Sequence, residues 1–416
     1  MQTAVTAPAS QNLARVAQGT QVLMRGLLFT PSIPRYAAAK LLGKRFPPRA
    51  LSLHLASLPE PERPNGFERL KVRLSGICGS DLALLYGKQA PTLSGMFSFP
   101  AILGHEILAE LGGVRVAVNP VLACLERGLP DCPACQRGDD HLCLNVAEGN
   151  LAPGMIGFCA DLGGGWAQRM VAHRERIFPI DESVPDERAV LAEPAAVVLH
   201  GIRQAWGQAH SPGAERASVL EASYPSLDTF SWPSQILVIG AGTIGLLTLK
   251  LLRVLGFDGR LHAVARHNRQ AELARLLGAD KVFPSTQAAQ QAAGARRYRG
   301  ILGATSWRGG YTGVVEASGS PGGLQEASWT VQEGGRVLLL GAPATAFHDF
   351  SPYWFREVRL VGSYAYSWDD FAQTVKLLPE MEGVEVLVTH KFALDAWPEA
   401  IKTAVAKRGI KVVFKP

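Results

Sequence analysis

The sequence predicts a two-domain α/β protein in which a β-rich domain accompanies a doubly wound parallel sheet. Three observations predict this fold class. The chain has 416 residues, more than one hydrophobic core usually organises. Short strand-like runs separated by turns fill residues 51–178, whereas apolar strands alternate with helical segments between about residues 194 and 345. The content of 47% apolar and 19% charged residues excludes a disordered chain.

The β-rich domain is expected over residues 24–196, after a small and polar segment, 1–23, that is expected to form a flexible tail. Its strands are predicted in the runs MRGLLFT (24–30), LSLHLASL (51–58), RLKVRLSG (69–76), VRVAVNP (114–120) and QRMVAHRERIF (168–178). The parallel-sheet domain is expected over residues 197–345. Beyond it, RLVGSYAYS (359–367), HKFAL (390–394) and KVVFKP (411–416) look like strands of the first domain again, so residues 346–416 are expected to complete that domain.

The charge balance gives little support to a nucleic-acid or membrane partner. Lys and Arg number 42 and Asp and Glu 36, a net charge of +6, and no dense basic run occurs. The longest uncharged window, 229–249, breaks at a Gly-rich turn before it reaches the roughly 20 apolar residues of a spanning helix. The N-terminus has no basic leader followed by an apolar run. We therefore expect a cytoplasmic protein that acts on a small molecule.

A nucleotide-binding loop is predicted where the apolar strand 235–239 meets the helical run LLTLKLLRVLG. The connecting residues, GAGTIG, carry the pattern G-x-G-x-x-G at Gly240, Gly242 and Gly245, with Thr243 and Ile244 between the last two. The first glycine permits the tight turn, the second allows backbone N–H groups to approach a pyrophosphate, and the third allows the helix to pack on the strand. A Gly-rich turn alone would be weak evidence. The strand before it and the helix after it favour a dinucleotide site.

The end of the next strand favours NADP over NAD. NAD sites usually place an acidic residue there to hold the ribose 2′-hydroxyl, whereas NADP sites accommodate the 2′-phosphate with an arginine. In LHAVARHNR (261–269), Ala265 occupies the expected acidic position, and Arg266 follows it. The alternative is a solvated basic turn beside an NAD site.

Four clustered cysteines predict a structural zinc site. Cys132 and Cys135 form a C-x-x-C pair, with Cys124 upstream and Cys143 downstream. Four thiolates close a tetrahedral zinc site and leave no open position. Two disulfides are the alternative. His141 lies in the same lobe and could replace one ligand, but we expect it to face the solvent.

A second set of metal-binding residue types is dispersed along the chain. Cys78 lies in GICGSD (76–81), His105 in GHE (104–106) and Glu193 in AEP (192–194). A thiolate, an imidazole and a carboxylate are ligands that an open catalytic zinc site uses. Each residue taken alone is equally compatible with a core or surface role, so spacing alone leaves this second site open.

Taken in order, GICGSD, GHE, the four-Cys lobe, AEP and GAGTIG resemble the zinc-dependent alcohol and polyol dehydrogenases of the medium-chain dehydrogenase/reductase superfamily. The resemblance extends from about residue 24 to residue 416 and is strongest to the threonine, sorbitol and glucose dehydrogenase branch. It implies a GroES-like catalytic domain built from both chain ends, a Rossmann coenzyme domain between them, and a homodimer or homotetramer.

The resemblance also implies roles for individual residues and two zinc ions per chain. Cys78, His105 and Glu193 would bind the catalytic zinc, and Glu106 would lie beside the metal and exchange with a ligand. Asp81 would orient His105, and Ser80 would pass the substrate proton outward. The reaction implied is reversible hydride transfer between an alcohol and NADP. The alternatives are an NAD-dependent threonine- or sorbitol-like dehydrogenase and, more remotely, a non-catalytic zinc-binding protein.

Three segments depart from the family pattern. Seven residues, LERGLPD, separate Cys124 from Cys132, where the family usually has C-x-x-C. The segment 105–116 is about a dozen residues shorter than usual, and the link at 210–234 is longer. His200, about two helical turns after Glu193, is expected to be structural. Cys159 matches no ligand position and is expected to be a buried or incidental thiol.

Overall fold

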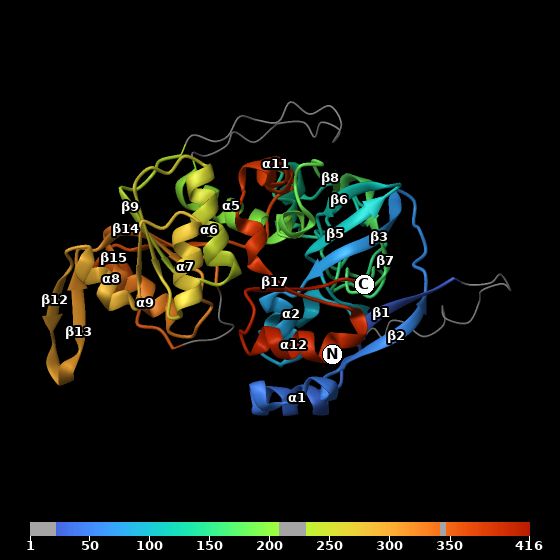
Figure 1. Ribbon diagram of the computed structural model, residues 1–416, viewed down its shortest axis with the longest axis horizontal. Coiled ribbons are helices and arrows are strands. Elements are labelled where there is room, and N and C mark those ends of the chain that lie inside the picture. The colour runs from blue at the N-terminus through green and yellow to red at the C-terminus, as the bar shows by residue number, and fades with distance from the viewer. Residues whose placement is uncertain (1–21, 208–229, 342–346) are drawn as a thin grey trace, which may run out of the picture.

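The computed structural model describes residues 22–207, 230–341 and 347–416. The parallel-sheet domain forms one end of the molecule and the β-rich domain the other (Figure 1). The predicted tail at 1–23 lies outside the described residues except for its last two, and Leu23 already belongs to a strand. Most of the long link at 210–234 also lies outside them.

The parallel sheet has six strands in the order β11-β10-β9-β14-β15-β16, and every pair is parallel. The order reverses between β9 and β14, and in open α/β sheets ligands bind at such a switch point, outside the carboxyl ends of the strands. The strands are β9 (Gln235–Ile239), β10 (Arg260–Val264), β11 (Lys281–Phe283), β14 (Tyr311–Glu316), β15 (Val331–Leu339) and β16 (Arg359–Gly362).

Helices cover this sheet, as its alternating sequence requires. They are α5 (Ala192–Trp206), α6 (Thr243–Val254), α7 (Asn268–Leu276), α8 (Thr286–Ala292), α9 (Gly323–Thr330) and α10 (Ser351–Phe355). A two-stranded antiparallel hairpin, β12 (Arg296–Arg299) and β13 (Thr305–Arg308), projects from the far end of this domain (Figure 1). This hairpin was not predicted from the sequence.

The β-rich domain is built around a seven-stranded sheet to which both ends of the chain contribute. Its strands are β3 (Phe67–Gly76), β5 (Ile107–Leu111), β6 (Val114–Val118), β7 (Arg169–His173), β8 (Ile177–Pro179), β17 (Val388–Phe392) and β18 (Lys411–Phe414). They pair in the order β17-β18-β3-β5-β6-β8, and β7 pairs with β3 in addition. The shortened segment forms a tight hairpin, because Gly112 and Gly113 both adopt positive φ between β5 and β6. A separate sheet contains β1 (Leu23–Phe29), β2 (Leu53–Pro59) and β4 (Ala101–Ile102).

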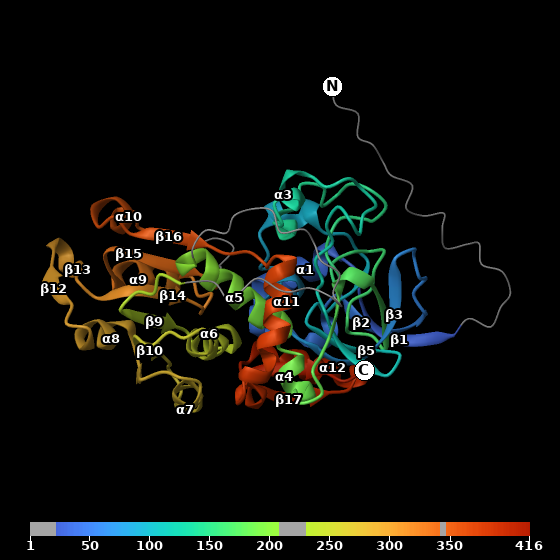
Figure 2. The ribbon, with the colours of Figure 1, turned by 90° about the horizontal axis from the view of Figure 1, so that it is seen from above.

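The remaining helices lie around these strands or between the two domains. They are α1 (Ile33–Leu42), α2 (Gly79–Leu85), α3 (Pro133–Gln136), α4 (Asp186–Ala189), α11 (Trp368–Leu377) and α12 (Trp397–Val405). Helices α5 and α11 lie between the two sheets (Figures 1 and 2). One hydrophobic core includes Phe178 and Leu108 of the β-rich domain together with Leu199 and Leu246 of the parallel-sheet side. No helix of the described residues is long and apolar enough to cross a membrane.

Two predicted domain boundaries differ from the structure. Residues 359–362 were expected in the second part of the β-rich domain, but they form β16 at the edge of the parallel sheet, paired with β15. The change of unit therefore comes after residue 362 and not at 346. The boundary at 196/197 falls inside helix α5, which is continuous from Ala192 to Trp206.

Candidate functional site

The predicted dinucleotide loop joins β9 to α6 at the switch point of the parallel sheet. Gly240 has φ of +102°, where a side chain would also approach the backbone of Ser318 to 2.8 Å. At Gly245, a Cβ atom would lie 1.8 Å from the carbonyl oxygen of Gly240, so the close approach of helix to strand requires glycine. The structure thus gives these two glycines the turn and packing roles that the pattern predicts.

Gly242 differs from the other two glycines because a Cβ atom there would meet nothing within 4 Å. It is the N-cap of the twelve-residue helix α6, whose first backbone N–H groups have no partner within the helix. The space in front of Gly242 and the positive end of the helix fit a pyrophosphate. Of the two residues between the glycines, Ile244 is half-buried, and Thr243 donates its hydroxyl to the carbonyl of Ile410 at 3.0 Å.

The end of β10 carries exposed basic side chains beside this loop. Ala265 is buried, and Arg266, His267 and Arg269 follow it on the surface. The side chain of Arg266 is 72% exposed, and its Nη2 lies 3.9 Å from Oε1 of Glu326. This pair is too long and too exposed to hold the arginine in place, so Arg266 is free to turn toward an anion.

One residue at the switch point was not found from the sequence. Glu316 ends β14 and is fully buried. Its carboxylate accepts hydrogen bonds from the N–H groups of Ser318 at 2.9 Å and Gly319 at 3.3 Å, and burial raises its pKa. These bonds fix the loop that faces Gly240.

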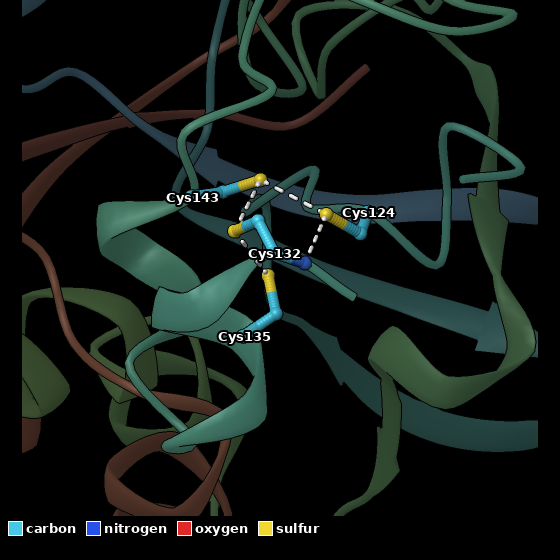
Figure 3. A group of neighbouring side chains, drawn as sticks. All are labelled: Cys124, Cys132, Cys135 and Cys143. Atoms are coloured by element: carbon cyan, nitrogen blue, oxygen red, sulfur yellow. Dashed lines mark hydrogen bonds between the residues drawn. The ribbon is translucent and has the colours of Figure 1, made fainter. Parts of the chain in front are cut away.

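The four clustered cysteines converge on one point (Figure 3). All four sulfur atoms lie within 4.8 Å of one another. The Cys124–Cys143 and Cys132–Cys135 sulfur distances are both 3.6 Å, and the Cys132–Cys143 distance is 4.0 Å. A tetrahedral zinc ion with bonds of about 2.3 Å requires sulfur atoms about 3.8 Å apart. All four are free thiols, far outside disulfide bonding distance, so the geometry fits the predicted structural zinc.

Backbone and amide N–H groups point at these sulfur atoms, as thiolate ligands require. Leu144 N lies 3.4 Å from Cys132 Sγ, and Asn145 Nδ2 lies 3.2 Å from Cys124 Sγ. Desolvation raises the pKa of Cys132, but hydrogen bonds from the backbone of Cys135 and Leu144 outweigh it and lower the pKa to about 6. Burial instead raises the pKa of Cys135 and that of Cys143, the latter to about 11, so of these three thiols only Cys132 is held as the thiolate that binds zinc.

A buried arginine that the sequence analysis did not single out anchors the Cys lobe. Arg176 is 1% exposed, and its guanidinium contacts Glu126 at 2.7 Å and Asp140 at 2.5 Å. Both carboxylates belong to the lobe, and Asp140 also accepts a hydrogen bond from the N–H of Trp368 at the start of α11. The charges of Glu126 and Asp140 outweigh burial and raise the pKa of Arg176. The lobe is therefore tied to the helix between the domains.

His141 does not face the solvent as expected. Its ring is half-buried and packs edge-on against His200, with 4.6 Å between ring centroids. His200 is buried and contacts Asp370 through Nδ1 at 2.7 Å, which agrees with the structural role expected for it. Cys159 is also buried, and its thiol donates to the carbonyl of Ala152 at 3.3 Å.

Two residues of the second predicted metal group, Cys78 and His105, come together from two separate segments, with Glu106 beside them. Ligand atoms of Cys78, His105 and Glu106 all lie within 4.8 Å of one another. Cys78 is the N-cap of α2, and His105 and Glu106 precede β5. The close packing requires glycine at position 76, because a Cβ atom there would lie 1.8 Å from Oε2 of Glu106. The GICGSD and GHE motifs therefore form one site.

Asp81 and Ser80 lie on either side of the His105 ring. Oδ1 of Asp81 is 3.4 Å from Nδ1 of His105, and both atoms are buried and lack a normal hydrogen bond. Ser80 Oγ is 3.4 Å from Nε2 on the other side of the ring. Burial lowers the pKa of His105, but the charges of Asp81 and Cys78 outweigh it and raise the pKa well above its usual value. An environment that stabilises a proton on this ring equally stabilises a metal cation beside it.

Glu106 is paired with a lysine that the sequence analysis did not identify. Lys411, on β18, is buried and places Nζ 2.6 Å from both carboxylate oxygens of Glu106. Burial lowers the pKa of Lys411, and the charge of Glu106 outweighs it and raises the pKa. From the sequence, Lys411 at the start of KVVFKP is expected to be a surface residue. Only the three-dimensional pairing of β18 with β3 reveals its role.

Glu193, the predicted third zinc ligand, is close to this group but not part of it. It lies in the first turn of α5, is buried, and accepts a hydrogen bond from the hydroxyl of Tyr366 at 3.0 Å. Burial raises its pKa to about 7, although the charge of His105 acts in the opposite direction. In this structure the carboxylate that gathers with Cys78 and His105 is Glu106.

Strand β18 connects the metal-ligand group to the dinucleotide loop. Thr243 of the loop binds the carbonyl of Ile410, and the next residue, Lys411, pairs with Glu106. The two predicted halves of the site are therefore neighbours, although more than a hundred residues separate them in the chain.

Comparison with known proteins identifies the class. Residues 67–182 match the family described as alcohol dehydrogenase GroES-like domain, and residues 243–380 match the family described as zinc-binding dehydrogenase. The chain is 26% identical over 351 residues to L-galactonate-5-dehydrogenase from Escherichia coli, covering 81% of this chain and 87% of that protein.

Two solved structures share the fold. One is a putative zinc-binding dehydrogenase from Sinorhizobium meliloti bound to NADP, with a TM-score of 0.68 and 22% identity over 95% of this chain and 100% of that chain. The other is acetophenone reductase from Geotrichum candidum in complex with NAD, with a TM-score of 0.68 and 20% identity over 97% of this chain and 99% of that chain.

These matches cover both domains and define a dehydrogenase with a GroES-like and a Rossmann-like part. The chain belongs to the zinc-binding medium-chain dehydrogenases, and it is an alcohol dehydrogenase of the zinc type.

Proposed function

We propose that the protein transfers a hydride reversibly between an alcohol carbon and the nicotinamide of NADP, with one catalytic and one structural zinc ion per chain. The observation that carries this proposal is the contact of the dinucleotide loop with the strand that holds Lys411 against Glu106. This contact supports a cofactor site beside a metal-ligand group, an arrangement that a non-catalytic zinc protein would not need.

Cys78 and His105 would hold the catalytic zinc, with a carboxylate completing the set. Glu193 is the proposed third ligand, and Glu106 is the proposed exchanging group, because Lys411 already neutralises it in this structure. When bound, zinc would act as a Lewis acid on the substrate oxygen, and the cofactor would accept or supply the hydride. The cysteine cluster of Figure 3 would hold the structural zinc.

The protein's own residues would orient the imidazole ring of His105 and carry the substrate proton. Asp81 would fix the orientation of His105 through Nδ1, leaving Nε2 for the metal. Ser80 is exposed and lies beside the same ring, so its hydroxyl can carry the substrate proton from the buried group to solvent. The ring of Phe158 packs on His105, with centroids 5.2 Å apart, and excludes water from that side.

The preference for NADP is supported by the absence of an acidic residue at Ala265 and by the exposed side chain of Arg266. Arg266→Ala is expected to weaken NADPH binding about tenfold while leaving NADH binding nearly unchanged, because only NADPH carries a phosphate for the guanidinium. Fluorescence titration with both cofactors measures this. Equal losses for the two cofactors would refute the assignment.

Two glycine variants separate cofactor binding from folding. Gly242→Ala is expected to abolish NADPH binding without changing the urea unfolding midpoint, because its Cβ atom meets only the space assigned to pyrophosphate. Gly245→Ala is expected to lower the midpoint as well, because its Cβ atom collides with Gly240. Tight NADPH binding by Gly242→Ala would show that the loop is not the cofactor site.

Cys78→Ala tests the catalytic metal group. It is expected to abolish turnover and to remove one of two bound zinc ions, while NADPH binding is retained. Full activity in this variant would overturn the proposed mechanism.

A homodimer or homotetramer is the expected assembly. Among the described residues, no strand pairs with the outer side of β16, and this edge together with the exposed side chains of Trp354, Phe355 and Leu360 near it supports self-association. Light scattering on purified protein tests this, and a monomer at micromolar concentration would contradict it.

A further inference from the structure

A cavity beside the Cys lobe is lined by none of the proposed catalytic zinc ligands, and the catalytic motifs give it no role. About 470 Å³ of empty space lies between its lining residues, a volume that includes open solvent. Its walls come from the Cys lobe and the chain on either side of it, the segment before β4, and the chain between β16 and α11, which links the two domains. Most of the lining side chains are apolar, namely Met96, Phe97, Val121, Leu122, Val146 and Met155.

Aromatic packing connects one wall of this cavity to the catalytic histidine. Phe97 lines the cavity and packs against Phe158, with ring centroids 5.2 Å apart. Phe158 packs in turn against His105, also at 5.2 Å. The cavity is therefore two ring contacts away from His105, a proposed zinc ligand.

The cavity offers few polar groups to a ligand. Asp140 lines it, but this carboxylate is already engaged by Arg176 and by the N–H of Trp368. Cys143 belongs to the thiol cluster. Among the lining side chains this leaves His141, whose Nδ1 is buried without a hydrogen-bond partner, and Tyr364. A polyol would lose hydrogen bonds to water here that two side chains cannot replace.

Ala365 forms the remaining wall in an unusual conformation. Its φ is +48°, a region that alanine rarely adopts. The neighbouring Tyr366 is held by Glu193, and Tyr364 lines the cavity. The strained backbone thus sets a methyl group, instead of a longer or polar side chain, at the boundary between the cavity and the proposed catalytic group.

We propose that this cavity binds the apolar substituent of the substrate, so that the preferred substrates are secondary alcohols and the matching ketones with an alkyl or aryl group. Polyols and hydroxy acids are poor substrates. This inference rests on the proposed dehydrogenase function and specifies its substrate class. The relative from Escherichia coli is instead named for L-galactonate.

The test compares two substrate series on the full-length, zinc-loaded enzyme with NADP. From 2-butanol to 2-hexanol, kcat/KM is expected to rise about three- to fourfold for each added methylene group. Sorbitol, xylitol and L-threonine are expected to be about a hundredfold poorer than 2-hexanol. Polyols that react faster than 2-hexanol would overturn the inference and leave the dehydrogenase assignment intact. Failure of every alcohol, together with loss of NADPH binding, would instead refute the proposed function.

Two variants locate the effect in the cavity. Ala365→Asn suits the positive φ and adds an amide to the wall, so it is expected to lower kcat/KM for 2-hexanol about tenfold and to reduce the chain-length dependence. Met155→Ala enlarges the cavity and is expected to move the optimum to longer alcohols. Leu93→Ala, on an exposed side chain outside the lining, is the matched control and is expected to match the wild type. An unchanged chain-length profile in both cavity variants would contradict the proposal.

Discussion

The buried arginine that anchors the Cys lobe yields a prediction whose magnitude follows from its contacts. Arg176→Met removes the positive charge from a site where both Glu126 and Asp140 have side chains that are 0% exposed. Removing one partner of a buried ion pair typically costs about 3–5 kcal/mol, because the remaining charge stays buried without compensation. Here two buried carboxylates lose their positive partner, so the loss in the free energy of unfolding is expected at the upper end of this range at pH 7.

The assay is urea unfolding followed by fluorescence, with zinc content measured on the same samples. Arg137→Met is the control, because Arg137 forms an exposed pair with Asp139 in the same lobe and is expected to contribute less than about 1 kcal/mol. The triple variant Arg176→Met, Glu126→Gln, Asp140→Asn keeps the acceptors for the Ala123 and Trp368 N–H groups but carries no buried charge. It is expected to recover most of the lost stability.

Two outcomes would refute this reasoning. A loss below about 1 kcal/mol for Arg176→Met would show that the guanidinium does not stabilise the lobe. A triple variant as unstable as the single one would show that the lost packing of the arginine side chain, and not the uncompensated buried charge, causes the loss. The direction in which this stabilisation changes with pH also follows from the structure. The charge of Arg176 outweighs burial and lowers the pKa of Glu126, so this contribution is present at neutral pH and is lost as pH falls through the folded-state pKa.

Two further predictions concern other buried ion pairs. Lys411→Met leaves Glu106 buried without its positive partner and is expected to lower the free energy of unfolding by about 3–5 kcal/mol. Urea titration measures this loss. Lys402→Met, at an exposed lysine, is the control. An effect no larger than that of the control would contradict it. Asp370 has a lowered pKa, because His200 and Arg203 outweigh burial, so its stabilisation is present above the unfolded value of about 3.9 and is lost as pH falls. The stability difference between wild type and Asp370→Asn should therefore be largest near pH 7 and shrink below about pH 4; a difference that grows on acidification would refute the assignment.

The parts of the site that are local in sequence could be predicted before the structure was known. The dinucleotide loop needs its three glycines within six residues, and the cysteine cluster lies within one lobe, so each leaves a readable spacing. The second metal group was recognisable only through its resemblance to a family, because Cys78 and His105 are 27 positions apart and no spacing rule links them.

Other features depend on contacts between distant residues and leave no local pattern. Nothing in RLVG distinguishes the edge strand β16 of the parallel sheet from a strand of the other domain, so its assignment required its register with β15. Arg176 and Lys411 read as surface residues because their partners, Asp140 and Glu106, are 36 and 305 residues away. Charged residues are rarely buried without such partners, and sequence alone does not show where the partners are.

The place of β18 has a consequence for how the protein is made. Strand β3 emerges from the ribosome early, but its neighbour β18 is translated only after the whole parallel sheet. During synthesis the nascent GroES-like unit has an unpaired strand edge, and Glu106 has no cation beside it until Lys411 arrives. The coenzyme domain can fold first as a unit, so the reaction centre is closed by the part of the chain translated after it.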